Sequence, residues 1–181
     1  LYQSEVQAVD QAIGGFLDTL KQQGLYDRAL IIFSSDHGEE FAEHDGYLHG
    51  HSLYNELVRV PLIIKLPNSE TTVRLAQPVS TVAIAPTIFD LASVPYDEEL
   101  YSASSLRNTW QESPTAGPSA PVFMTGVNSA EPAEAVVWEN YKFIRWQNIH
   151  HEELYDIETD PNEQYNLALR MLKQVAIGKA L

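Results

Sequence analysis

The apolar and polar positions of the first 24 residues repeat with the period of a helix. Apolar side chains fall on one helical stripe, made of Val6, Val9, Ile13, Phe16, Leu17 and Leu20. This spacing predicts an amphipathic helix, with Ser4 and Gln7 as a capping box at its start. Gly24 predicts its end, because glycine readily adopts the left-handed conformation found just past a last helical turn.

Two short runs that follow are apolar without alternation, at residues 29–33 and 60–66. Such runs are typical of strands that are covered on both faces in a parallel sheet. A second helix is expected over residues 78–94, with Ser80 or Thr81 as its cap. The order helix, strand, long loop, strand, helix predicts an α/β fold, as part of a larger mixed sheet with flanking helices.

The pattern changes after residue 95. Residues 96–120 are rich in proline, serine and acidic side chains, which predicts a connecting segment. Beyond them, short runs predict a small antiparallel sheet with strands at 121–125, 135–139, 141–146 and 153–156. A terminal helix is expected from Asn162 onward. We therefore expect three parts: the α/β portion at 1–95, the connection at 96–120, and an antiparallel α+β subdomain at 121–181.

The composition is that of a soluble globular protein and disfavours several kinds of partner. The formal net charge of −14 argues against nucleic-acid binding, because phosphates would be repelled. No apolar run approaches the roughly 18 residues that a membrane span needs. The chain has no cysteine, which excludes disulfides, thiolate metal sites and a cysteine nucleophile. Periplasmic, extracellular and cytoplasmic locations all tolerate such a chain, so the compartment is unknown.

The loop between the two apolar runs is dense in side chains that bind metals and move protons. Asp36-His37-Gly38 follows the first run directly. Three more histidines come after it: His44, His49 and His51. Loops at strand ends are where α/β enzymes hold metals and substrates. A carboxylate and a neutral imidazole at one strand end can face the same cation. An independent zinc cluster of the three later histidines is an alternative, although their spacing lacks a helical metal pair.

Several stretches of the chain resemble the sulfatases, a family within the alkaline phosphatase superfamily. SSDHGEEFAEH and HGHSLYNELVRVPLII are similar to the second signature region of that family. The flanks agree in order, with VQAVDQAIGGFLDTLKQQGLYD before this region, QPVSTVAIAPTIFDLASV after it, and ELYDIETDPNEQYNLA near the end. The resemblance covers nearly the whole chain. It implies the last part of a large mixed α/β domain, followed by a small antiparallel sheet with a helix.

This resemblance implies roles for four residues of the loop. Asp36 and His37 correspond to the second ligand pair of a divalent cation, most simply Ca²⁺. His49 corresponds to a position often filled by a lysine that binds the transferred sulfate or phosphate group. His44 lies near the place where the family loop approaches the substrate. Asp36 and His37 are therefore the expected metal ligands, and His49 and His44 the expected catalytic residues.

Other charged residues have simpler interpretations. Glu40 and Glu43 are expected to lie in a solvated acidic loop. His51 is interpreted either as an exposed loop residue or as a further site residue. His150 and His151, which precede two glutamates, are expected to be solvated.

The nucleophile of a sulfatase is absent from this chain. It lies in a C/S-x-P/A-x-R segment, whose cysteine or serine is oxidised to formylglycine. Ser93-Val-Pro95-Tyr-Asp97 comes nearest and fails at Asp97. We therefore expect this chain to be the C-terminal third or so of a longer enzyme, inactive by itself. The resemblance implies that the intact enzyme hydrolyses sulfate esters of small molecules or glycans, through a formylglycine nucleophile and a divalent cation.

Two alternatives stay open. One uses the same scaffold on phosphorus, as a phosphodiesterase, a phosphonate hydrolase or a phosphoethanolamine-type transferase, with Mn²⁺ or Zn²⁺ in place of Ca²⁺. The Asp36-His37 pair slightly favours these softer metals. The other alternative is a non-catalytic binding module. Strand edges left uncovered in a shortened chain would also predict a homodimer.

Overall fold

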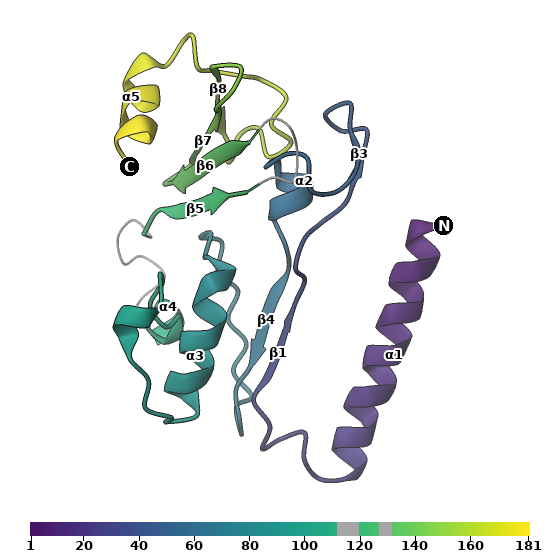
Figure 1. Ribbon diagram of the computed structural model, residues 1–181. Helices are drawn as coiled ribbons and strands as arrows, with labels where there is room; N and C mark the ends of the chain where they lie inside the picture. The colour runs from purple at the N-terminus through teal and green to yellow at the C-terminus, as the bar shows by residue number, and fades with distance from the viewer. Residues whose placement is uncertain (112–119, 127–131) are drawn as a thin grey trace. The chain divides into compact units, whose positions relative to one another are not determined.

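The computed structural model describes residues 1–111, 120–126 and 132–181 (Figure 1). The chain forms two compact units. The first consists of residues 1–36 and 60–72, and the second of residues 37–59 and 73–181. The loop that begins at His37 therefore belongs to the same unit as the C-terminal sheet.

The first unit begins with α1 (Tyr2–Gln22), which forms along the predicted apolar stripe (Figure 1). The predicted capping box is wrong, because the helix starts ahead of Ser4 and Leu1 occupies the N-cap position. The Ser4 hydroxyl instead donates to the Leu1 carbonyl oxygen at 2.5 Å. Gly24 has a φ of +66° just past the helix, as predicted. Within the described residues, none of the α1 side chains is buried.

The two apolar runs form β1 (Ile31–Ser34) and β4 (Leu62–Lys65), which pair with each other. They are antiparallel, so the parallel arrangement predicted from their continuous apolar character is wrong. A parallel pair needs a crossover of a dozen or more residues that returns the chain to the starting edge, usually as a helix. The only helix between these strands in the described structure is four residues long. Phe33 and Ile63, which lie opposite each other, are 38% and 60% exposed, so one of the two faces expected to be covered is open within the described residues.

The second unit contains an antiparallel sheet whose strands follow one another in chain order (Figure 1). Its strands are β5 (Val122–Thr125), β6 (Ala133–Trp138), β7 (Tyr141–Trp146) and β8 (His151–Asp156). This confirms the predicted sheet. The terminal helix α5 (Leu172–Ala180) starts ten residues later than predicted, because turns fill the segment after Asn162. Gly178 of α5 lies so close to β7 that an added Cβ would sit 2.8 Å from the Phe143 Cβ.

Each face of this sheet has its own apolar core. One face joins α5 to the sheet through Val136, Trp138, Phe143, Leu154, Ala168 and Val175. The other face holds Leu53, together with Ala133, Ala135, Ile144 and Tyr155. Tyr54 and Val58 pack against this second cluster. The loop that carries the histidines therefore packs against the C-terminal sheet.

That loop contains a short hairpin and one turn of helix. β2 (Glu40–Phe41) pairs antiparallel with β3 (Tyr47–Leu48), and α2 (Asn55–Val58) follows. None of these elements was predicted, because two-residue strands and a four-residue helix are too short to show a period.

The second unit also contains four helical segments in its described residues: η1 (Thr81–Ala83), α3 (Ile84–Leu91), η2 (Glu98–Leu100) and α4 (Arg107–Gln111). The Ser80 hydroxyl accepts a hydrogen bond from the Val82 amide, which confirms the predicted cap. The Leu106 amide donates to the Thr87 hydroxyl at 2.8 Å and joins the connecting segment to α3. The division at residues 95 and 120 stays a prediction. In the described part of the chain, no helix has the length and apolarity to cross a membrane.

Candidate functional site

The loop over residues 37–59 is closed by a contact between its two ends. The Gly38 amide donates to the Leu57 carbonyl oxygen at 2.8 Å. A Cβ atom added at Gly38 would lie 1.9 Å from the Glu56 carbonyl oxygen, which is a backbone atom that cannot turn aside. Only glycine fits here, because the two backbone segments touch. The close approach at Gly38 is thus made by the protein's own backbone.

Two of the predicted site residues come together in this loop. The rings of His37 and His49 stack, with centroids 4.0 Å apart and planes 25° from parallel. The Nδ1 atom of His49 lies 3.3 Å from a Glu39 carboxylate oxygen, and half of the His49 side chain is exposed. Asp36 precedes His37 directly at the end of β1, and it belongs to the other compact unit.

The hydrogen bonds of His37 suit a metal ligand. Its Nδ1 atom lies 2.7 Å from the Gly38 carbonyl oxygen, which can only accept. Nδ1 therefore carries a proton, and in the neutral ring Nε2 is the nitrogen that has the lone pair. The described residues contain no group of three or more histidine, aspartate or glutamate side chains arranged to hold a metal. Asp36 and His37 are thus ligands of the right chemistry, but these described residues do not complete a site, and the proposed cluster of His44, His49 and His51 does not form.

His44 lies away from this stack and bridges two parts of the second unit. Its Nδ1 atom is 2.6 Å from a Glu56 carboxylate oxygen, and its Nε2 atom is 3.0 Å from the Glu163 backbone oxygen. The ring also stacks on Tyr54, with centroids 3.7 Å apart. The Glu163 carbonyl and an ionised Glu56 carboxylate both accept hydrogen bonds, so this arrangement favours the imidazolium form of His44. In this arrangement His44 ties the loop to the segment after β8, and its predicted catalytic role stays a prediction.

The stability that His44 contributes should depend on pH. Burial lowers the pKa of His44, but the Glu163 carbonyl and the Glu56 carboxylate outweigh burial and raise it above its usual value. A group with a raised folded pKa stabilises the protein below its unfolded pKa of about 6.5, and that stability is lost as pH rises through the folded pKa. The free-energy difference between wild type and His44→Gln should therefore shrink from pH 6 to pH 9.

Urea unfolding across this range measures the effect, with His150→Gln as the control because His150 is exposed. The control should show little difference from wild type at any pH. A His44→Gln deficit that stays constant across the range would contradict a charged His44.

Glu40 is buried within the β2–β3 hairpin and binds several of its groups. The expectation that its side chain is solvated is therefore wrong. Only 1% of it is exposed, and its carboxylate accepts from the His44 amide, the Gly46 amide and the His51 Nε2 at 3.0, 2.7 and 2.6 Å. Burial raises the pKa of Glu40, but the hydrogen bonds from His51 and the two amides outweigh it, so the pKa lies below its usual value. His51 is therefore a structural partner of this carboxylate.

The start of α2 is held by a buried ion pair that the sequence pattern did not reveal. Lys142 Nζ and Glu163 Oε1 are 2.7 Å apart, and both side chains are fully buried. Lys142 also donates to the Asn55 side-chain oxygen at 3.1 Å, and the Asn55 amide donates to Glu163 at 2.6 Å. Burial lowers the pKa of Lys142 and raises that of Glu163, and each partner offsets the other's shift only in part. The single sequence signal was a lysine next to Phe143 and Ile144 in a predicted strand.

Tyr54, which lies beneath His44, is fixed by a second buried acid. Its hydroxyl donates to the Glu153 carboxylate, with both oxygens 3.0 Å away. Burial and the negative charge of Glu153 raise the pKa of Tyr54 above its usual value, so the phenol stays protonated. His151 lies 3.0 Å from the same carboxylate and so has a defined partner, while His150 is exposed as expected.

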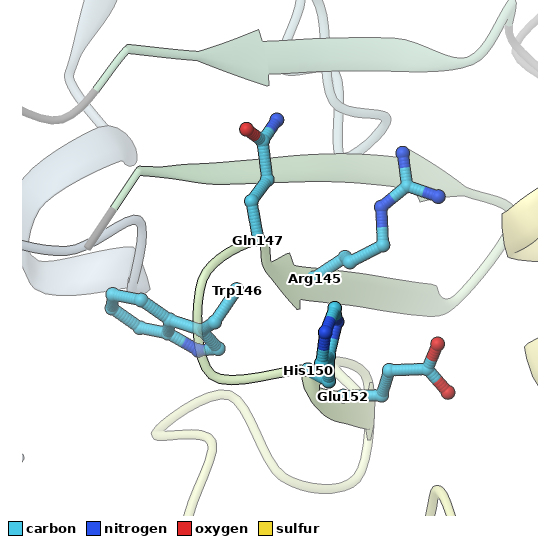
Figure 2. A pocket seen from close by; sticks show the side chains of 5 residues that line it. All are labelled: Arg145, Trp146, Gln147, His150 and Glu152. Atoms are coloured by element: carbon cyan, nitrogen blue, oxygen red, sulfur yellow. The ribbon is translucent and has the colours of Figure 1, made fainter.

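Two hollows lie on the second unit. The first, of about 260 Å³, is at the end of β7 and is lined by Arg145, Trp146, Gln147, His150 and Glu152 (Figure 2). Its charged groups are already paired, since Arg145 lies 2.6 Å from Glu134 and Lys179 lies 2.7 Å from Glu152. The second, of about 420 Å³, borders the loop and is lined by Glu43, Asn55, Glu56, Arg59, Pro161, Asn162 and Gln164.

Comparison with known protein families matches residues 1–94 to the family described as Sulfatase. Among curated proteins, the N-acetylglucosamine-6-O-sulfatase of Bacteroides thetaiotaomicron is 29% identical over 174 residues, which cover 92% of this chain and 31% of the relative. The choline-sulfatase of Rhizobium meliloti is 29% identical over 179 residues, covering 92% of this chain and 32% of the relative. The chain therefore spans about a third of the length of these relatives.

Solved structures agree with the fold. A protein determined in complex with its substrate D-glucosamine-2-N,6-O-disulfate superimposes with a TM-score of 0.78 at 25% identity, covering 97% of this chain and 37% of that one. A phosphonate monoester hydrolase from Silicibacter pomeroyi superimposes with a TM-score of 0.76 at 20% identity, covering 95% of this chain and 37% of that one. The second likeness shows the shared fold alone. Both confirm the predicted alkaline phosphatase-like α/β architecture.

Proposed function

Because this chain belongs to the sulfatase family, we propose that the intact protein hydrolyses sulfate esters and that the loop over residues 36–59 forms part of its active site. The observation that carries this proposal is the stack of His37 on His49. The candidate metal ligand and the candidate proton donor are in contact there, in a loop whose two ends are joined by the hydrogen bond from the Gly38 amide to the Leu57 carbonyl oxygen. The region matched to the family contains this whole loop.

We assign the first step of recognition to three side chains of this loop. The Asp36 carboxylate and the His37 Nε2 would hold a divalent cation, Ca²⁺ as the first choice, with the remaining ligands supplied from outside these described residues. When bound, such a cation neutralises charge on the transferring group. His49 would donate a hydrogen bond to an oxygen of the sulfate group, because its ring lies against His37 and half of it is exposed. Glu39 would orient the His49 ring.

The nucleophile is proposed to be a formylglycine, which the family resemblance implies and which this chain does not contain. A hydroxyl of the hydrated formylglycine would attack sulfur, so that a new O–S bond forms as the ester S–O bond breaks. The sulfate group would pass to the hydrate, and the leaving oxygen of the ester would take up a proton to give the alcohol. His49 and His44 are the candidate donors in this chain. Of the two, His49 is favoured, because both ring nitrogens of His44 already have protein partners.

The proposed substrate is a sulfated sugar or a small sulfate ester. Two proteins similar to this chain support the sugar: one is named for N-acetylglucosamine 6-sulfate chemistry, and the other was solved with a disulfated glucosamine. The choline-sulfatase relative supports a small ester instead. The likeness to a phosphonate monoester hydrolase keeps phosphorus chemistry as the second candidate. A homodimer stays a prediction.

A substrate panel tests this proposal directly. The intact protein should release sulfate from N-acetylglucosamine 6-sulfate or 4-nitrophenyl sulfate, and it should act far more slowly on 4-nitrophenyl phosphate and phenylphosphonate esters. Activity should disappear with a chelator and return with added Ca²⁺. Faster turnover of the phosphorus esters would favour the second candidate. Turnover of none of these substrates would favour a non-catalytic binding module.

A further inference from the structure

Burial of the ion pair between Lys142 and Glu163 costs free energy, and both residues also contact a third residue. Taking two charges out of water costs several kcal/mol per ion, and well-packed apolar side chains often replace such pairs without loss of stability. A gain in stability therefore does not by itself explain why two charged side chains are buried here. Its other contacts are more informative, because both partners also bind Asn55, the first residue of α2.

The side-chain oxygen, the side-chain nitrogen and the backbone amide of Asn55 all make hydrogen bonds. Its side-chain oxygen accepts from Lys142 at 3.1 Å, its backbone amide donates to Glu163 at 2.6 Å, and its side-chain nitrogen donates to the Pro161 carbonyl oxygen at 3.0 Å. These bonds come from β7 and from the segment after β8. The first turn of α2 is thus fixed in position by the C-terminal sheet.

From α2 the contacts continue to the candidate site. The Glu56 carbonyl oxygen lies directly against Gly38, and the Leu57 carbonyl oxygen accepts from the Gly38 amide. His37 is bonded to Gly38 through the chain, and its ring stacks on His49. A shift of α2 would therefore move Gly38, and with it both site histidines.

Glu163 also contacts the loop through its backbone carbonyl group. Its carbonyl oxygen accepts from His44, whose other ring nitrogen binds Glu56 on α2. Glu163 has a φ of +54°, a conformation that favours glycine. The contacts of its side chain and of its carbonyl group to the same loop keep it there. One residue of the C-terminal segment therefore fixes α2 from two directions.

We propose that Lys142, Glu163 and Asn55 are positioning residues, which set the place of α2 and thereby hold His37 and His49 in the geometry that the reaction needs. This inference rests on the proposed function, since it assigns the C-terminal sheet a task in sulfate ester hydrolysis. None of the three residues is proposed to touch the substrate. They act through α2 and Gly38.

Hydrogen exchange in the intact protein tests the positioning step without reference to activity. Asn55→Ala removes two side-chain hydrogen bonds and leaves the buried ion pair intact. We expect the Gly38 amide to exchange about tenfold faster, because a lost anchoring bond opens the loop locally. Amides of β7 and β8 should change less than about twofold. An unchanged Gly38 amide, or equal acceleration in loop and sheet, would overturn the proposal.

The double variant Lys142→Met/Glu163→Gln is the second test, because it removes both buried charges together. It should also accelerate exchange at Gly38 by about tenfold. Lys179→Met is the matched control, since Lys179 makes a 2.7 Å ion pair with Glu152 on the same sheet but is half exposed. This control should leave the Gly38 amide unchanged. A double variant that behaves like Lys179→Met would count against the proposal.

Steady-state kinetics test whether the position of the loop affects the rate of the reaction. For a sulfate ester that the intact protein hydrolyses, Asn55→Ala should lower kcat by about tenfold to a hundredfold, since a displacement of about 1 Å in a site can cost that much. The KM should stay within about threefold, because substrate binding is not the affected step. An unchanged kcat would overturn the proposal. If the wild-type protein hydrolyses no sulfate ester, the proposed function fails, and the exchange result still decides whether these residues hold the loop.

Discussion

Replacing Lys142 with methionine should lower the free energy of unfolding by about 3–5 kcal/mol, because removing one partner of a buried pair leaves an uncompensated charge. Glu163 would remain fully buried, with the Asn55 amide as its one strong donor among the described residues. The loss should be smaller at pH 5 than at pH 8, since the raised pKa of Glu163 lets its carboxylate take up a proton as the pH falls.

Urea denaturation of wild type, Lys142→Met and Lys142→Met/Glu163→Gln measures this effect. The double variant should recover most of the loss, because the glutamine keeps an acceptor for Asn55 and leaves no buried charge. Lys179→Met, at a half-exposed ion pair, should cost no more than about 1 kcal/mol. Equal losses for Lys142→Met and Lys179→Met would show that the buried pair has no special importance.

Replacing Gly38 with alanine should separate α2 from the start of the loop. The new Cβ would have to sit 1.9 Å from the Glu56 carbonyl oxygen, so the hydrogen bond from Gly38 to Leu57 could not survive. We expect a loss of about 3 kcal/mol, at the upper end of the usual cost of inserting one methyl group. Activity of the intact protein should fall by about a hundredfold, because His37 and His49 move with the loop.

Gly14→Ala is the control for this substitution. Nothing described lies within 4 Å of a Cβ at Gly14, which is in the middle of α1. Alanine should therefore stabilise that helix by up to about 1 kcal/mol. Thermal unfolding and sulfate release compare the two variants. A Gly38→Ala protein with wild-type stability and activity would show that the contact between Gly38 and α2 is unimportant.

The parts of the fold that depend on local periodicity were predictable from the sequence. The stripe of α1 and the strand over Tyr141–Trp146 follow from side-chain spacing alone. The direction of pairing between β1 and β4 did not follow, because a continuous apolar run contains no information about its neighbour. The late start of α5 was also missed, since polar turns after Asn162 resemble the first turn of a helix.

The buried charges of the site could not be predicted for a different reason. Lys142 is 87 residues from Asn55 in the chain, and Glu163 is 108 residues from it. A sequence shows a charge but not the partner that makes its burial possible. Glu40 was misjudged in the same way, because its three donors come from turns whose geometry the sequence does not state. Family resemblance, by contrast, did lead to His37 and His49, which the structure brings into contact.

The histidines of this loop are proposed to act in sulfate ester hydrolysis. The most direct test is the kcat/KM of the intact protein for a sulfate ester in His49→Ala, beside His150→Ala as an exposed histidine outside the loop. We predict a loss of at least about a hundredfold for His49→Ala, the size expected when a proton donor to the reacting group is removed. His150→Ala should stay within about twofold of wild type. A His49→Ala protein that hydrolyses the ester as fast as His150→Ala would contradict the claim.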